Sequence, residues 1–110
     1  MNANDRLLHY NCSDNYYKHL QGLVYTDGVR ALCTQFKCYW LLDLIASHQP
    51  KLREEFQVWK LTRNGYTATV KATDGNDNKL ITQHIPYTDF EADECTIWIE
   101  GNVMLLPSEH

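Results

Sequence analysis

The hydrophobic residues in the middle of the chain recur at helical spacing. Val29, Leu32 and Phe36 fall on one helix face, and a nearly continuous apolar stretch over residues 39–47 predicts a buried central helix. Pro50 follows shortly after this stretch, where a proline ends a helix because it lacks the backbone N–H group. The pattern therefore predicts two consecutive helices.

Residues that cap helices precede the apolar runs. Thr26 and Asp27 can each accept a hydrogen bond from the unpaired N–H groups at a helix start. Ser13 or Asp14 can cap a further short helix over residues 14–20 in the same way. The first half of the chain is therefore predicted to be helical.

After Glu55 the hydrophobic pattern changes to the alternation that is typical of strands. Asn64-Gly65 is the strongest hairpin signal in the chain, and tight turns are also predicted over residues 74–78 and at Gly101-Asn102. Because the connections are short, neighbouring strands are expected to pair antiparallel. The predicted strands cover residues 56–63, 66–73, 79–86, 95–100 and 103–106.

These elements predict an α+β fold in which a helical N-terminal half packs on a four- to five-stranded antiparallel β-meander. The length of 110 residues is typical of a single domain, so we expect one domain over residues 1–110. Residues 1–6 are expected to be flexible, and residues 107–110 to fray.

Composition narrows the classes of function. The net charge is −4, with 10 Lys and Arg against 14 Asp and Glu, and no dense basic run is present. We therefore expect no direct binding to nucleic acid. The longest apolar stretch is too short to span a bilayer, and residues 1–5 do not resemble a signal peptide. A cytoplasmic protein that does not bind membranes is expected.

The chain has four cysteines, which in the cytoplasm are expected to be reduced and mostly buried. Their spacing does not match a zinc site, and we expect neither a metal nor another cofactor. The cysteines are Cys12, Cys33, Cys38 and Cys95.

The sequence contains none of the common catalytic motifs, including the glycine-rich phosphate loop and the serine nucleophile elbow. One acid–base unit is nevertheless conceivable, in which His84 pairs with Asp89 or Asp43. Such a unit would suit a small hydrolase or a nucleotide-binding protein. A lone histidine on a strand is more often a packed or hydrogen-bonded residue, so a non-enzyme is favoured.

An ordered set of motifs resembles a family of small uncharacterised bacterial proteins of about this length. The similarity covers nearly the whole chain after Leu7, although Glu91 stands where the family pattern has a proline. The resemblance implies a stand-alone cytosolic protein that is often carried by phages or plasmids, and it names no catalytic residue. The motifs are Tyr25-Thr26-Asp27-Gly28, residues 39–49 (YWLLDLIASHQ), residues 56–61 (FQVWKL), Tyr87-Thr88-Asp89-Phe90 and residues 105–110 (LLPSEH).

Our first hypothesis is a small noncatalytic protein-binding module. The resemblance suggests an inhibitor or modulator that a mobile element uses against a host antiviral defence system, as anti-CRISPR proteins do. Its partner would be a host protein or protein complex. Tryptophans in these strands pack in the core by default, but on a sheet face that no helix covers Trp59 and Trp98 would instead form an exposed aromatic strip. We predict that the partner contacts Trp59, Trp98, Asp89 and Glu91.

The alternative to binding and catalysis is a structural homodimer. An open sheet edge can pair with its own copy, and the short last strand over residues 103–106 is the predicted edge.

Overall fold

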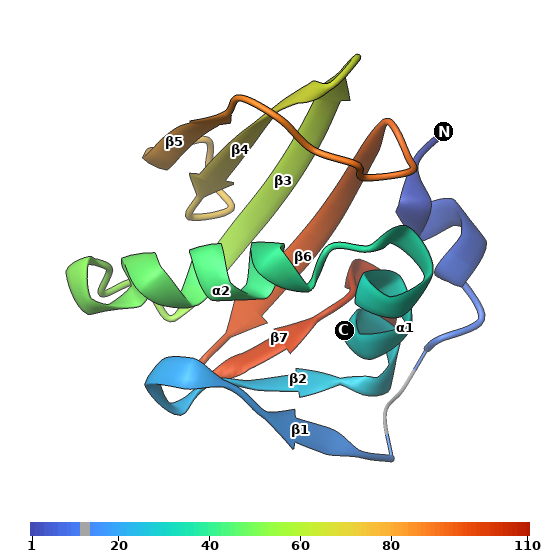
Figure 1. Cartoon of the computed structure of the whole chain (residues 1–110). Coiled ribbons are helices and arrows are strands. Elements are labelled where there is room, and N and C mark those ends of the chain that lie inside the picture. Colours follow the sequence, from blue (N-terminus) through green and yellow to red (C-terminus); the bar gives the residue numbers. More distant parts are fainter. Residues whose placement is uncertain (12–13) are drawn as a thin grey trace.

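The computed structural model describes residues 1–11 and 14–110, and Cys12 and Ser13 lie outside the described residues. The chain forms a sheet of seven strands with two α-helices (Figure 1). The strands are β1 (Tyr16–Lys18), β2 (Val24–Thr26), β3 (Phe56–Asn64), β4 (Thr67–Thr73), β5 (Lys79–Ile85), β6 (Glu94–Glu100) and β7 (Val103–Leu105). The helices are α1 (Asp27–Phe36) and α2 (Tyr39–His48), with short 3-10 helices η1 (Ala3–Leu7), η2 (Leu20–Gly22), η3 (Gln49–Lys51) and η4 (Pro107–Glu109).

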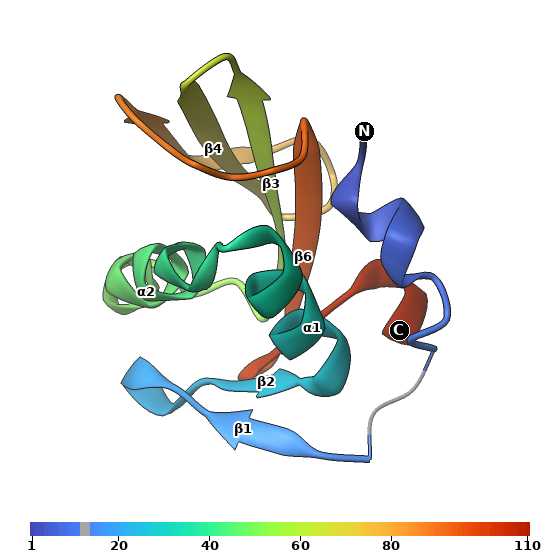
Figure 2. The same cartoon turned by 45° about the vertical axis from the view of Figure 1, so that its right-hand side comes forward.

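The strand order across the sheet is β1-β2-β7-β6-β3-β4-β5. Every neighbouring pair is antiparallel except β2 and β7, which run parallel. The sheet curves around α1 and α2, which both lie on its concave side (Figure 2). Their apolar faces, together with the inward residues of β3, β4 and β6, form the hydrophobic core.

The prediction of a helical N-terminal half is wrong, because two strands of the mixed sheet lie there. Tyr16 to Lys18 form β1 instead of the expected short helix, and β1 pairs antiparallel with β2. A strand exposes alternate side chains, which suits the β-prone Tyr16-Tyr17 pair: Tyr16 is exposed and Tyr17 is half-buried. Strand β2 has only three residues, which are too few for an alternating pattern of apolar and polar residues to be recognised.

The prediction of a four- to five-stranded antiparallel meander is also wrong. All five predicted C-terminal strands exist, but β6 does not pair with β5; it returns to the middle of the sheet and pairs with β3. Burial explains why β6 and not β5 has a central position in the sheet. Cys95, Ile97 and Ile99 of β6 are fully buried, whereas β5 has no buried residue. The more apolar strand takes the central position, and β5 becomes an edge.

Residues at the start of the chain pack against β6. Asn4 accepts from the Thr96 backbone N–H at 2.7 Å and donates from Nδ2 to the Thr96 carbonyl at 2.9 Å. Ala3 and Leu7 are completely buried. Asn4 thus takes the place of a strand partner for β6 at Thr96, which lies beyond the end of the short β7. Residues 1–6, which we expected to be flexible, include this contact.

The two central helices are confirmed. Thr26 caps α1, because its Oγ1 accepts from the Val29 N–H at 3.2 Å. The Asn64-Gly65 turn joins β3 and β4, with Gly65 at φ +65°. No helix in the described residues is long and apolar enough to cross a membrane.

The last residues of the chain pack against the start of α1. Glu109 accepts from the Thr26 hydroxyl at 2.6 Å and from the Gly28 N–H at 3.3 Å, and it also accepts from the Leu106 N–H at 3.0 Å. A carboxylate is favourable there, because the N-terminus of a helix carries a partial positive charge. Residues 107–110 are thus anchored, where fraying was expected.

Three of the four cysteines meet in the core: Cys33 of α1, Cys38 at the start of α2 and Cys95 of β6. Cys33, Cys38 and Cys95 are buried and are not joined by disulfides, as predicted for these three. Hydrogen bonding to Cys38 and burial together raise the pKa of the Cys33 and Cys95 thiols. No group of three or more His, Cys, Asp or Glu side chains in the described part of the chain is arranged to hold a metal ion.

Burial is expected to keep these three thiols from reacting while the protein is folded. This holds also for Cys38, because it is fully buried even though hydrogen bonds with Cys33 and Cys95 lower its pKa. In the native protein at pH 7, we expect maleimide to leave Cys33, Cys38 and Cys95 unlabelled over minutes, because only an accessible thiolate is nucleophilic. In denaturant, all three thiols are accessible and should be labelled rapidly. Mass spectrometry of peptides from the labelled protein measures both rates. Fast native labelling of Cys95 would contradict the packing of β6.

Candidate functional site

A polar hollow lies where β1 meets the first turn of α1. Strand β2 runs directly into the helix, because Thr26 is both its last residue and the N-cap of α1. In the antiparallel register Tyr16 lies opposite Thr26, and Tyr17 lies opposite Tyr25. The Tyr17 side chain is therefore held beside Asp27, the first residue of the helix.

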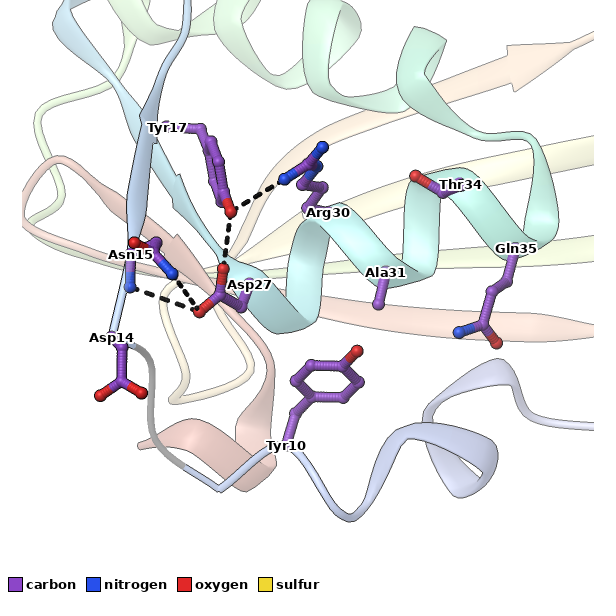
Figure 3. A pocket seen from close by; sticks show the side chains of 9 residues that line it. All are labelled: Tyr10, Asp14, Asn15, Tyr17, Asp27, Arg30, Ala31, Thr34 and Gln35. Atoms are coloured by element: carbon purple, nitrogen blue, oxygen red, sulfur yellow. Dashed lines mark hydrogen bonds between the residues drawn. The ribbon is translucent and has the colours of Figure 1, made fainter.

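One face of α1 forms a wall of this hollow. Residues 27, 30, 31, 34 and 35 recur at helical spacing on the side away from the buried Val29, Leu32 and Phe36. The hollow has a volume of about 630 Å³. We call it the Tyr–Arg hollow, and it is lined by Tyr10, Asp14, Asn15, Tyr17, Asp27, Arg30, Ala31, Thr34 and Gln35 (Figure 3).

A chain of hydrogen bonds fixes the polar groups at one end of the hollow. The Tyr17 hydroxyl donates to Asp27 Oδ1 at 2.8 Å and accepts from Arg30 Nη1 at 2.9 Å. Asn15 donates to Asp27 Oδ2 from its backbone N–H at 3.3 Å and from Nδ2 at 3.4 Å. Figure 3 shows Asn15, which directly precedes β1, Tyr17 of β1 and Arg30 of α1 converging on this point.

Arg30 also lies over an aromatic ring. Its guanidinium carbon is 4.7 Å from the centroid of the Tyr17 ring, which is the geometry of a cation–π contact. The hydrogen bond to Tyr17 raises the pKa of the exposed Arg30, whose guanidinium is charged at neutral pH in any case. Tyr17 therefore presents Arg30 in a defined direction at the surface.

Further tyrosines border the hollow. Tyr10 points toward α1 from the opposite side (Figure 3). The Tyr39 hydroxyl lies 3.0 Å from Thr34 Oγ1, which lines the hollow. The described residues that line the hollow carry hydroxyl, amide, carboxylate and guanidinium groups. These groups suit noncovalent binding.

The structure places the two predicted tryptophan contacts on opposite faces of the sheet. Trp59 is 1% exposed and lies beneath α2, where its Nε1 donates to Gln57 Oε1 at 2.8 Å. Trp98 is half-buried on the outer face and packs edge-on against Phe56 and His110. The two rings therefore do not form one aromatic strip.

The two predicted acidic contacts lie in the loop between β5 and β6, and both are exposed. Glu91 Oε1 lies 3.1 Å from Lys37 Nζ at the end of α1. This ion pair raises the pKa of Lys37, with a smaller contribution from Asp89. Contact of a partner with Asp89 and Glu91 stays a prediction.

The predicted acid–base residues do not all meet. Asp43 of α2 lies 3.0 Å from His19 Nε2 rather than against His84. Gln83 reaches His48 of α2 at 2.7 Å, so the adjacent His84 points to the other face of β5, away from both helices. Asp43 and His84 thus lie on different sides of the sheet.

Sequence reasoning missed the Tyr–Arg hollow because it assigned Tyr17 to a helix. The polar face of α1 was visible as the i, i+3, i+4 spacing of residues 27, 30, 31 and 34. Nothing in the sequence showed that Tyr17 would lie against it, since that contact depends on the pairing of β1 with β2.

Comparison with known proteins gives a family without an assigned activity. No curated protein and no solved structure matches the chain significantly. The model of a family of unknown function, DUF6876, matches residues 1–110. Since that match covers the whole chain, the protein belongs to the family of unknown function DUF6876.

Proposed function

We propose that this protein is a noncatalytic binding module that holds a peptide segment of a partner protein in the Tyr–Arg hollow. The observation that carries the proposal is the exposed Arg30, which the Tyr17 ring and hydroxyl hold in one direction inside a concave surface. A side chain that is already ordered loses less entropy when a partner binds.

The residue types support a protein partner. Tyrosine and arginine are enriched among the residues that contribute most to binding energy at protein interfaces. Tyrosine offers a large contact area with few rotatable bonds, and hydroxyl and amide groups adapt to the backbone of a peptide. The hollow combines both kinds of group in Tyr10, Tyr17, Arg30, Thr34 and Gln35.

The charges in the hollow limit the chemistry of the segment. Asp14 and Asp27 line the hollow together with Arg30, which is the one cation among its described lining residues, so these residues carry no excess of positive charge. An uncharged polar peptide that donates to the carboxylates and accepts from Arg30 is therefore favoured over an acidic one. That the partner belongs to a host defence system stays a prediction from the sequence resemblance.

A library of random displayed peptides, selected on the immobilised full chain, tests the proposal. We expect enriched peptides whose Kd rises at least about tenfold in R30A, equivalent to about 1.4 kcal/mol, and also rises in Y17F, which lacks the hydroxyl that orients Arg30. Fluorescence polarisation with the selected peptides measures Kd. K18A is the matched control, because Lys18 is an exposed residue of β1, next to Tyr17, and does not line the hollow.

Three outcomes would reject the hollow as the site. They are a selection without enriched peptides, peptides that bind wild type and R30A equally well, and a loss of binding in K18A as large as in R30A. Circular dichroism on each variant confirms that the fold is retained.

A further inference from the structure

The outer face of the sheet carries two lysines side by side. Both helices lie on the other face, so β3, β4 and β5 have no helix over their outer side (Figures 1 and 2). Lys60 of β3 lies directly opposite Lys71 of β4, which in turn lies opposite Thr82 of β5. Because side chains alternate along a strand and Trp59 and Ala72 are buried, both lysines point outward.

A hollow of about 510 Å³ on this face joins the lysines to polar side chains in the next row of the register. In that row Thr62 lies opposite Thr69, which lies opposite His84. We call the residues that line it the lysine face: Lys60, Thr62, Asn64, Thr67, Ala68, Thr69, Lys71 and His84.

The charges on the lysine face are poorly compensated within the protein. Like charges directly opposite each other on neighbouring strands destabilise a sheet. Lys60 Nζ lies 3.6 Å from Glu94 Oε2, with the two side chains 54% and 35% exposed, so solvent weakens but does not abolish this ion pair. Lys71 forms no ion pair with any residue in 1–11 or 14–110. The arrangement leaves a cationic site on a protein whose net charge is −4.

We propose that the lysine face binds a small oligophosphate, which is a ligand with two or more linked phosphate groups. Such a ligand presents anionic oxygens to Lys60 and Lys71 at once and offsets their mutual repulsion. The hydroxyls of Thr62 and Thr69 can donate to further phosphate oxygens. This site lies on the opposite side of the sheet from the helices and does not depend on the proposed peptide binding.

The ligand is expected to be small rather than a nucleic-acid strand. Affinity for nucleic acid grows with the number of phosphates that lysines and arginines neutralise, and the lysine face has two lysines. Glu94 borders the site beside Lys60, and the net charge of the whole chain is negative, which opposes a long polyanion.

Isothermal titration of the full chain with inorganic tripolyphosphate tests the proposal. We expect saturable binding whose Kd rises at least about tenfold in K71T, because the substitution removes one of the two cations. Orthophosphate at equal ionic strength should bind at least about tenfold more weakly than tripolyphosphate. K18T is the matched control, since Lys18 is exposed on the edge strand β1, remote from this face.

Stability distinguishes a ligand site from a structural role. Threonine favours strands, and its introduction removes the Lys60–Lys71 repulsion, so the urea midpoint of K71T should equal or exceed that of wild type in the absence of ligand. Weaker binding without lower stability supports the site. The proposal is overturned if tripolyphosphate does not bind at millimolar concentration, if K71T binds like wild type, or if orthophosphate binds equally well. A single-stranded oligothymidylate that binds more tightly than tripolyphosphate, with the same loss in K71T, would overturn the small-ligand assignment.

Discussion

Replacing Trp59 with alanine should cost about 3–5 kcal/mol of the free energy of unfolding, which is a large part of the stability of a domain of this size. The Trp59 ring is 1% exposed and stacks against His48 of α2 with ring centroids 6.0 Å apart. Alanine would leave a cavity between β3 and α2 that rigid neighbours fill only partly.

Trp59 also forms a hydrogen bond with the buried side chain of Gln57. Its Nε1 donates to Gln57 Oε1, and Gln57, which is itself 1% exposed, exchanges hydrogen bonds of 3.0 Å with Gln49 at the end of α2. W59F keeps most of the ring and leaves Gln57 its bonds to Gln49, so its cost should be clearly smaller than that of W59A.

Urea denaturation followed by circular dichroism measures these differences without depending on tryptophan fluorescence. W98A is the control, because Trp98 is only half-buried on the outer face and should cost less than W59A. A W59A variant as stable as W98A would show that Trp59 is not the main core residue between β3 and α2.

The second large effect is expected at Gly28, where alanine should destabilise the protein by about 1–3 kcal/mol. A Cβ atom at this position would lie 2.5 Å from Glu109 Oε1 and 2.9 Å from Leu106 Cδ1. Glu109 can make room only by moving its carboxylate away from Thr26, Gly28 and Leu106, and these lost hydrogen bonds outweigh the roughly 1 kcal/mol by which alanine exceeds glycine in helix propensity. The close approach of Glu109 therefore explains why residue 28 is a glycine.

A double-mutant cycle with E109A isolates this contact. E109A alone should destabilise the protein by roughly 1–3 kcal/mol, because the Thr26 hydroxyl and the Gly28 and Leu106 N–H groups lose their acceptor. In that background G28A should cost less, with a coupling energy on the order of 1–2 kcal/mol, since the carboxylate that it meets is gone. Thermal unfolding of the four proteins gives the cycle, and strictly additive effects would contradict the contact.

The sequence by itself determined those elements that depend on local residue patterns. The apolar spacing over Val29, Leu32 and Phe36 predicted α1, and Thr26 predicted its N-cap, because both effects act within a few residues. The Asn64-Gly65 turn and the alternation of the five C-terminal strands were equally local. Three cysteines were also correctly predicted to be buried and reduced.

Only the tertiary structure decided which strands are neighbours. The short β1 and β2 lack a clear periodic signal, and they are stabilised by pairing with each other and with β7, which lies about 80 residues further along the chain. Competition for burial places β6 beside β3 and moves β5 to the edge. Neither choice can be inferred from one segment alone.

Both candidate sites follow from these long-range decisions. The contact of Tyr17 with Arg30 requires β1 to pair with β2, and the adjacent Lys60 and Lys71 matter because no helix covers the outer face. The sequence specified the chemical groups and the local elements that carry them. Their juxtaposition was set by strand pairing and by the burial of apolar surface, because these terms depend on residues far apart in the chain.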